Sequence, residues 1–140
     1  NRRSEPARSI LMPVVFAEAN LDIASYGLEP EPLGSFETTP ETVAFFDQLQ
    51  AYSQTPRLHE LIGVNYDCCH LAVEFENAGE GLGKLMNSGI RLSKLHLSSA
   101  LCTKPSLENL RLLDSFVEEV YLHQVGLYLG FYKSHSLRFP

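Results

Sequence analysis

The chain has 140 residues, of which 44% are hydrophobic and 20% are charged, a balance typical of a folded domain rather than a disordered segment. Its net charge of −6 excludes a dedicated polyanion-binding protein, because phosphate neutralisation needs clustered lysine and arginine, so we expect no nucleic-acid partner. The apolar runs fall far short of the roughly 20 residues of a membrane-spanning helix, and we expect no direct membrane insertion.

The cysteines indicate a reducing compartment. Cys68, Cys69 and Cys102 are odd in number and include a vicinal pair, which makes a poor disulfide framework. The absence of a C-x-x-C spacing excludes a zinc ribbon. No secretory signal pattern opens the chain, so we expect a cytoplasmic protein.

The first elements predicted are a helix, a strand and a second helix. Apolar residues at helical spacing predict a helix between residues 5 and 24, weakened by Pro13, and a short extended run predicts a strand over residues 24–28. The prolines at positions 30 and 32 then predict a stiff loop. Thr39, as an N-cap before proline and glutamate, predicts a helix over residues 40–51.

The middle of the chain continues this alternation. Residues 61–66 are apolar and β-prone and predict a second strand that ends at Asp67. Asn77 fits the N-cap of a helix that runs to Met86 and is closed by Gly89, and residues 90–97 predict a third strand.

The C-terminal third is less regular. Residues 105–113 predict a helix, residues 120–125 a further extended segment, and residues 126–140 show no clear period. Strands separated by helices are the pattern of parallel βαβ units. No strand-to-helix junction carries G-x-G-x-x-G, so an open dinucleotide-binding sheet is disfavoured against a (β/α)-barrel.

The length bears on the barrel prediction. A complete (β/α)₈ barrel takes about 250 residues. We therefore expect residues 1–140 to be a fragment of a single TIM-barrel domain, truncated at both ends, with about three to four βα units. Its open sheet edges predict a tendency to aggregate.

Residues with metal-binding side chains recur where the predicted strands end. Glu29 is followed by Glu31, Asp67 by His70, and the third strand carries His96. The carboxyl ends of parallel strands meet at one edge of a sheet, so these side chains can converge. Carboxylate and imidazole ligands suit Mn²⁺, Mg²⁺, Fe²⁺ or Zn²⁺, and we predict a divalent-metal site.

Each of these residues also has a simpler role. Asp67 fits the N-cap of a helix that follows its strand, and Glu29 fits a solvated loop residue. His70 and His96 fit buried histidines with hydrogen-bonded rings. The Asp-x-x-His spacing at a strand end favours the ligand role for Asp67 and His70.

Further residues lie near the predicted site. Lys94 shares the strand parity of His96, so it is predicted to point inward and serve an anionic group or an enolate. Glu74 and Glu76 are expected to face water. Possible pocket residues are Tyr121 and His123, and the safer interpretation of Cys68 and Cys69 is buried thiols, with soft-metal ligation as the alternative.

Three segments together resemble a known superfamily. They are YGLEPEP at residues 26–32, NYDCCHLAVEFE at residues 65–76 and KLHLSSAL at residues 94–101. In this order they resemble the xylose-isomerase-like TIM-barrel superfamily, with the metabolite-traffic protein EboE family as the closest likeness. The resemblance extends from about residue 26 to the YLHQ segment at residues 121–124.

The resemblance implies a barrel of the sugar isomerase, epimerase and apurinic endonuclease type. It implies a divalent metal held here by Glu29, Asp67, His70 and His96. A final glutamate ligand usual in the superfamily has no counterpart in this sequence. The EboE family is linked with operons that move or process a secondary-metabolite precursor, which implies a small-molecule metabolite and partner proteins of an export or processing operon.

Two functions of different class follow. The first is a metal-dependent isomerase or epimerase of a small polyhydroxylated or carbonyl substrate, in which Glu29 or Glu31 moves a proton and Lys94 serves an anion. The second is a non-catalytic carrier that uses the barrel pocket to bind a metabolite. Metal-dependent phosphoester hydrolysis is disfavoured by the acidic balance.

Overall fold

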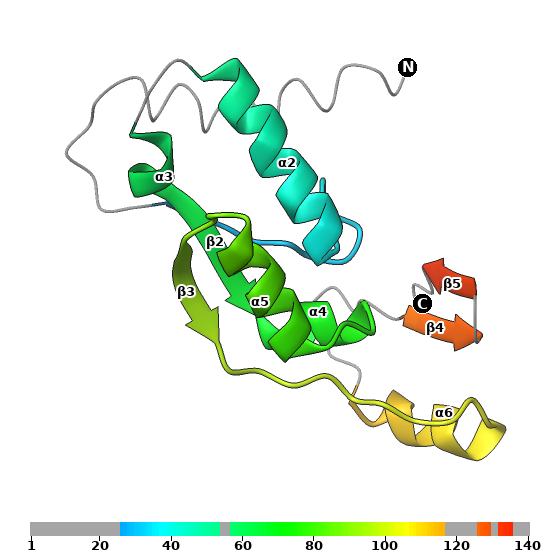
Figure 1. Ribbon diagram of the computed structural model, residues 1–140. Coiled ribbons are helices and arrows are strands. Elements are labelled where there is room, and N and C mark those ends of the chain that lie inside the picture. Colours follow the sequence, from blue (N-terminus) through cyan, green and yellow to red (C-terminus); the bar gives the residue numbers. More distant parts are fainter. Residues whose placement is uncertain (1–25, 54–56, 117–125, 130–131, 136–140) are drawn as a thin grey trace.

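A computed structural model describes residues 26–53, 57–116, 126–129 and 132–135 (Figure 1). A three-stranded parallel sheet with the order β1-β2-β3 forms its centre. The strands are β1 (Tyr26–Leu28), β2 (Ile62–Asp67) and β3 (Leu92–His96). The helices are α2 (Thr39–Tyr52), α3 (Leu58–Leu61), α4 (Cys68–Val73), α5 (Ala78–Asn87) and α6 (Leu107–Asp114).

The mixed α/β class and the parallel strands predicted from the sequence are confirmed. The helices predicted over residues 40–51, 77–86 and 105–113 correspond to α2, α5 and α6, with ends that differ by one or two residues. The short helices α3 and α4 were not predicted. The predicted helix over residues 5–24 and the extended segment over residues 120–125 lie outside the described residues, as do Tyr121 and His123.

The residues that follow 125 also differ from the prediction. Residues 126–140 show no clear period in the sequence, yet β4 (Gly126–Leu129) and β5 (Tyr132–His135) pair as an antiparallel hairpin. Neither GLYL at residues 126–129 nor YKSH at residues 132–135 alternates strictly between apolar and polar residues, which is the pattern that predicts a strand. The chain therefore contains a second, two-stranded sheet besides the parallel one.

Helix α2 begins with a capping box. The Thr38 hydroxyl accepts a hydrogen bond from the backbone N–H of Glu41, and the Glu41 carboxylate accepts one from the backbone N–H of Thr38. The predicted cap at Thr39 is therefore wrong by one residue. Thr39 is the first helical residue, and its backbone N–H donates to Glu76 at 2.8 Å.

Helix α5 ends as its sequence predicts. Gly89 has a φ of +71°, the left-handed conformation that glycine adopts at no steric cost. Its N–H donates to the carbonyl of Met86, and the N–H of Ile90 donates to the carbonyl of Leu85. The chain thereby turns directly into β3.

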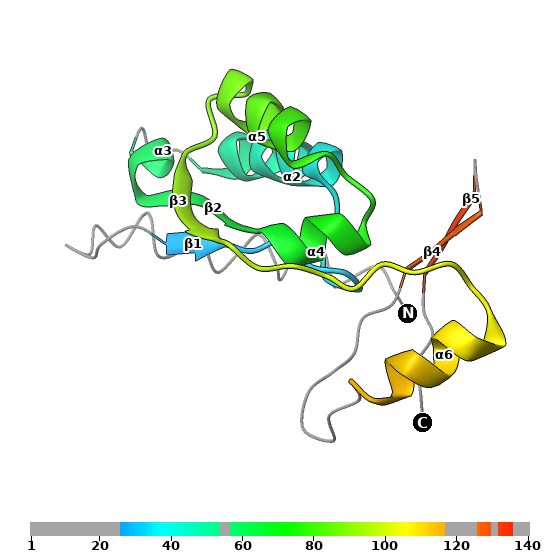
Figure 2. The same cartoon turned by 90° about the horizontal axis from the view of Figure 1, so that it is seen from below.

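The hydrophobic core lies between the sheet and two helices on one of its faces. Helices α2 and α5 cover this face, as Figure 2 shows. Strand β2 contributes Ile62, Val64 and Tyr66, each at most 1% exposed. The other core residues are Phe46, Leu49, Leu58, Leu61, Leu71, Leu85 and Ile90.

The opposite face of the sheet is strongly curved. Adjacent strands lie about 4.8 Å apart, so the outer strands of a flat three-stranded sheet are separated by about twice that distance. Here the Ser93 hydroxyl of β3 donates to the Tyr26 carbonyl of β1 at 3.2 Å, across β2. Gly27 and Gly63 permit this approach, since a Cβ on Gly63 would lie 2.4 Å from the Ser93 hydroxyl oxygen.

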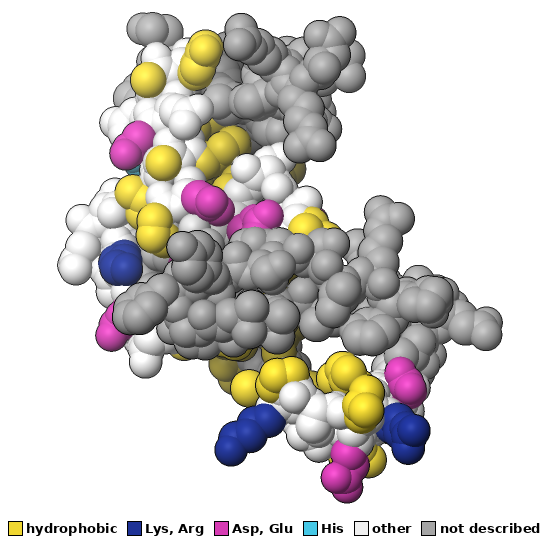
Figure 3. Space-filling view, turned by 90° about the vertical axis from the view of Figure 1, so that its right-hand side faces the viewer, with side chains coloured by type: hydrophobic (Ala, Val, Ile, Leu, Met, Phe, Trp, Pro, Cys, Tyr) yellow, Lys and Arg dark blue, Asp and Glu magenta, His cyan; other side chains and the backbone are white. Residues whose placement is uncertain are grey.

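The segment after β3 is exposed and apolar. Leu97 is 87% exposed, and α6 has no buried residue. Figure 3 shows hydrophobic side chains gathered on the surface of α6 beside lysine, arginine and carboxylate side chains. Within the described part of the chain, no helix has both the length and the apolar character needed to cross a membrane.

Candidate metal centre

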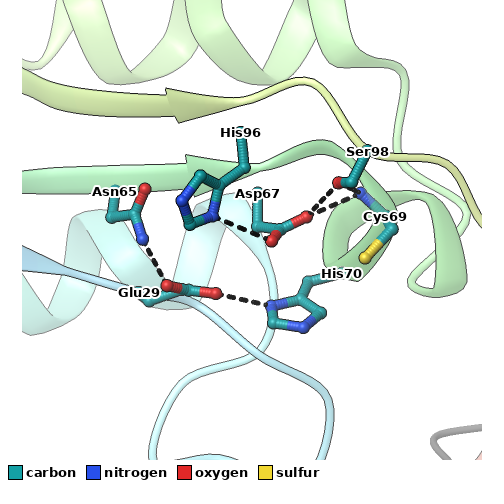
Figure 4. A network of polar contacts seen from close by, with 7 residues as sticks. All are labelled: Glu29, Asn65, Asp67, Cys69, His70, His96 and Ser98. Carbon is teal, nitrogen blue, oxygen red and sulfur yellow. Dashed lines mark hydrogen bonds and ion pairs between the residues drawn. The ribbon is translucent and has the colours of Figure 1, made fainter.

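Strand topology brings the predicted ligands together. Glu29 follows β1, Asp67 ends β2 and His96 ends β3, and because the strands are parallel these ends share one edge of the sheet. His70 joins them from the first turn of α4 (Figure 4). All four residues predicted as metal ligands therefore lie in one polar network.

Asp67 lies at the centre of this network. Its Oδ2 is 3.1 Å from Nδ1 of His96. Its Oδ1 accepts hydrogen bonds from the Ser98 hydroxyl and from the backbone N–H of Cys69, the latter at 3.0 Å. The second contact caps α4, so the alternative role of Asp67 as an N-cap is confirmed. A carboxylate with two oxygens can fill both roles.

The environment favours an ionised Asp67. Burial raises the pKa of its carboxyl, but hydrogen bonds from Ser98 and Cys69 and the neighbouring His70 outweigh burial. The net effect holds the pKa well below its ordinary value. Asp67 is thus a charged, oriented carboxylate at neutral pH.

Glu29 links Asn65 to His70. One of its oxygens accepts a hydrogen bond from the Asn65 amide, and the other lies 3.1 Å from Nδ1 of His70. The His70 contact does not have hydrogen-bond geometry, and the buried Nδ1 has no hydrogen-bond partner among the described residues. The buried Oδ1 of Asn65 is likewise without one. Unsatisfied ligand-type atoms at a cluster of carboxylates fit a site built for a further polar species.

The ligand atoms form two overlapping groups. Glu29, Asp67 and His96 make the first, and Asp67, Cys69 and His70 the second, with the ligand atoms of each group within 4.8 Å of one another. The single four-residue set expected from the sequence is therefore divided, and Asp67 belongs to both groups. Both sets have the oxygen, nitrogen or sulfur donors that divalent cations take in proteins.

Two residues predicted to be catalytic lie apart from this network. Glu31 is exposed in a turn, where its carbonyl accepts from the N–H of Gly34 at 2.9 Å. Lys94 is exposed, and its Cα pairs with Asn65. The register shift between Val64 and Asn65 lies before Lys94, so Lys94 and His96 keep the shared strand parity on which the prediction was made.

The expectation that Glu74 and Glu76 face water is wrong. Glu74 is only 4% exposed. Glu76 accepts hydrogen bonds from the backbone N–H and the hydroxyl of Thr39. These bonds link the segment after α4 to the first residue of α2. Helix α4, which was not predicted, lies between β2 and this segment, and Glu76 after it reaches Thr39 at the start of α2.

Sequence reasoning did not predict the roles of Asn65 and Ser98. Asn65 precedes Asp67 by two residues on β2, so strand alternation places both on one face, and this signal was present in the sequence. Ser98 lies after β3 ends, where no periodicity applies. Its hydroxyl donates to Asp67 and accepts from the N–H of Cys69 at 2.9 Å.

The vicinal cysteines have different surroundings. Cys68 packs against the hydrophobic core, whereas Cys69 belongs to the second ligand group. Burial raises the pKa of the Cys69 thiol, and the charges of Asp67 and Glu29 act in the same direction. Both side chains are half-buried, so neither is the fully buried thiol that the sequence-based interpretation favoured.

Comparison with known proteins gives no match to this chain among family models, curated proteins or solved structures. The resemblance to the xylose-isomerase-like superfamily therefore stays a prediction that depends on the three sequence segments.

Proposed function

We propose that this chain is part of a xylose-isomerase-like (β/α)₈ barrel that acts as a metal-dependent isomerase or epimerase on a small polyhydroxylated or carbonyl metabolite. The observation that carries the proposal is the convergence of Glu29, Asp67 and His96 at the carboxyl edge of three parallel strands. This is the edge at which barrel enzymes hold their substrates.

The shape of the sheet supports the barrel. Helices α2 and α5 cover only one face of the parallel strands, and the other face curves until β1 and β3 touch across β2. Closing a sheet into a barrel requires such curvature, with small residues where the interior is narrow. Gly27 and Gly63 are the small residues at this place.

The donor set suits a hard or borderline divalent cation such as Mn²⁺, Mg²⁺ or Zn²⁺. When bound, such an ion polarises a carbonyl and orients adjacent hydroxyls. Ser98 and the N–H of Cys69 hold Asp67 in place, and Asn65 holds Glu29. The chain's own groups thus fix the ligands before a cation arrives.

Glu29 is the residue that we assign to proton transfer. Its carboxylate is oriented by the Asn65 amide and lies beside the imidazole of His70, which can take up or supply a proton. Glu31 is exposed and lies in a separate turn, so it serves as the matched control for Glu29.

The experiment follows hydrogen exchange at the substrate carbon atoms. The full chain, loaded with Mn²⁺, Mg²⁺ or Zn²⁺, is incubated in D₂O with a panel of aldoses, ketoses and their phosphates, and deuterium incorporation is measured by NMR. The proposal predicts metal-dependent exchange with at least one substrate, lost in Glu29→Gln and retained in Glu31→Gln. No exchange with any substrate by metal-loaded, folded protein would contradict it.

A non-catalytic metabolite carrier is the second candidate. It is favoured by the fact that both carboxylates of the described network, Glu29 and Asp67, are themselves candidate ligands, which leaves no further carboxylate in the network to act as a base. A carrier binds a member of the same panel without exchange and with little dependence on metal. Binding measured beside exchange therefore distinguishes the two.

A further inference from the structure

We propose a second cation position, held by Asp67, Cys69 and His70, that takes a thiophilic divalent ion such as Zn²⁺ or Co²⁺. The proposal rests on the metal centre proposed above only through the shared Asp67, and it does not depend on catalysis. Its basis is that one oxygen, one sulfur and one nitrogen donor from a single short segment lie within 4.8 Å of one another.

Asp67 can serve both positions because its two oxygens point to different neighbours. Oδ2 lies 3.1 Å from Nδ1 of His96, on the side of the first group. Oδ1 accepts hydrogen bonds from the Ser98 hydroxyl and from the backbone N–H of Cys69, the residue that supplies the sulfur donor. A cation at the second position would take the place of one of these two hydrogen bonds.

His70 supplies the nitrogen donor. Its Nδ1 is buried and makes no hydrogen bond among the described residues, although Glu29 lies 3.1 Å away. For a buried ring nitrogen in this position, a carboxylate contact without hydrogen-bond geometry replaces the lost solvation of the lone pair or N–H only in part. A cation restores a partner to this nitrogen, which a purely structural histidine would not need.

Cys69 supplies the donor that distinguishes this position from the first. Successive residues of a helix point about 100° apart, so the vicinal thiols face different surroundings. Cys68 packs against the core, and Cys69 faces the ligand edge. When the ion binds, the Cys69 thiol loses its proton to solvent and a metal–sulfur bond forms.

The chemistry of the donors sets the selectivity. Thiolate ligands favour Zn²⁺ and Co²⁺, whereas the carboxylates and imidazole of Glu29, Asp67 and His96 also suit Mn²⁺ and Mg²⁺. The two positions therefore differ in the ion that each prefers. A thiophilic ion in the second position would leave the first available to a harder ion.

The test is a Co²⁺ titration of the full chain, kept anaerobic and free of thiol reductants, because thiolate ligation to Co²⁺ gives a near-ultraviolet charge-transfer absorption. The wild-type chain is expected to show this absorption and to bind more than one equivalent. Cys69→Ser should lose the absorption and at least about tenfold in Zn²⁺ affinity, the loss typical of removing even an outer-shell partner. Cys68→Ser and Cys102→Ser should retain both.

Two further results separate this proposal from the first centre. Loss of one equivalent in His96→Ala with the absorption unchanged is the outcome expected if both positions exist. Co²⁺ binding without the absorption, abolished entirely by His96→Ala, would overturn the second position and leave the first intact. If His96→Ala shows the absorption and binds as many equivalents as the wild type, the first position would be overturned and the second left intact. No binding of Co²⁺ at all would contradict both positions.

A measurement on the wild-type chain tests the second position even if the Cys69→Ser variant does not fold. Iodoacetamide labelling, read by peptide mass spectrometry, is compared with and without Zn²⁺. Zn²⁺ is expected to protect Cys69 and leave the exposed Cys102 unprotected. Equal labelling of Cys69 in both samples would overturn the proposal.

Discussion

The two faces of strand β2 differ in what buries them. Ile62, Val64 and Tyr66 belong to the hydrophobic core, together with residues of α2 and α5. The alternate residues Gly63, Asn65 and Asp67 are also buried, with Asn65 and Asp67 each 8% exposed, but their neighbours are glycines and polar side chains on the curved face of the sheet. Alternation along a single strand therefore separates the residues that stabilise the fold from those that hold the candidate site.

The largest expected effect is on the core face. Leu49 of α2 is fully buried, so Leu49→Ala leaves a cavity and should lower the free energy of unfolding by about 2–5 kcal/mol. Urea denaturation, monitored by circular dichroism, measures this change in the free energy of unfolding. Leu112→Ala, at an exposed position of α6, is the control and should change stability by less than about 0.5 kcal/mol. Equal effects of the two variants would contradict the assignment of the core.

A smaller loss is expected on the curved face. A Cβ at Gly63 would lie 2.4 Å from the Arg91 carbonyl oxygen, so Gly63→Ala must displace β3 and should destabilise the chain by about 1–3 kcal/mol. Gly83 in α5 has open space around it, and Gly83→Ala should stabilise the helix by about 0.5–1 kcal/mol. Thermal unfolding should show a lower midpoint temperature for Gly63→Ala and a higher one for Gly83→Ala than for the wild type. If Gly63→Ala stabilised the chain, β2 and β3 could not approach each other as closely at Gly63 as the structure indicates.

The pH dependence of stability reports on Asp67. Its pKa in the folded protein is lowered, so the ionised carboxylate contributes stability above roughly pH 4, the ordinary aspartate value, and this contribution is lost as the pH falls toward the lowered folded-state pKa. Asp67→Asn should therefore flatten the acid limb of a plot of unfolding free energy against pH. The exposed Asp114→Asn serves as the control. An unchanged acid limb in Asp67→Asn would contradict the network.

The smallest effect is expected at Tyr66. Its hydroxyl is buried and has no hydrogen-bond partner among the described residues, so Tyr66→Phe should be neutral or stabilise the fold by about 1 kcal/mol at neutral pH. Burial, with the charge of Glu76, raises the pKa of the phenol, so wild-type stability should fall as the pH rises above roughly 10. Tyr66→Phe should lack this contribution to alkaline unfolding. A clear loss of stability at pH 7 would reveal a partner for the hydroxyl.

Much of the fold could be predicted because its signals are local. Asn77 and Gly89 cap and close α5 through contacts within a few residues, and the apolar run of β2 is evident in the sequence. Helix α4 could not be predicted in this way. Its cap at Asp67 was among the predicted roles, but the helix has only six residues, which is too short for a helical spacing of apolar residues to be recognised.

Most residues of the candidate site could be predicted from the sequence, but their division into two groups of possible metal ligands could not. The rule that parallel strands meet at one edge is enough to bring Glu29, Asp67 and His96 together. The division into two ligand groups depends on α4, which turns Cys69 and His70 to the same side of Asp67. Side-chain directions of this kind follow from tertiary packing, which spacing in the sequence does not encode.

The metal content of the protein is the most direct test of a metal centre at the carboxyl edge of the parallel sheet. The full chain is reloaded with Zn²⁺ or Mn²⁺, freed of excess ion and analysed by elemental mass spectrometry beside Asp67→Asn, His96→Ala and His59→Ala. His59 is exposed on α3, away from the network, and is the matched control for His96. We expect at least one equivalent of metal in the wild type and in His59→Ala, and a lower metal content in both of the other variants. Equal metal in all four proteins, or none in the folded wild type, would contradict a metal centre at the carboxyl edge of this sheet.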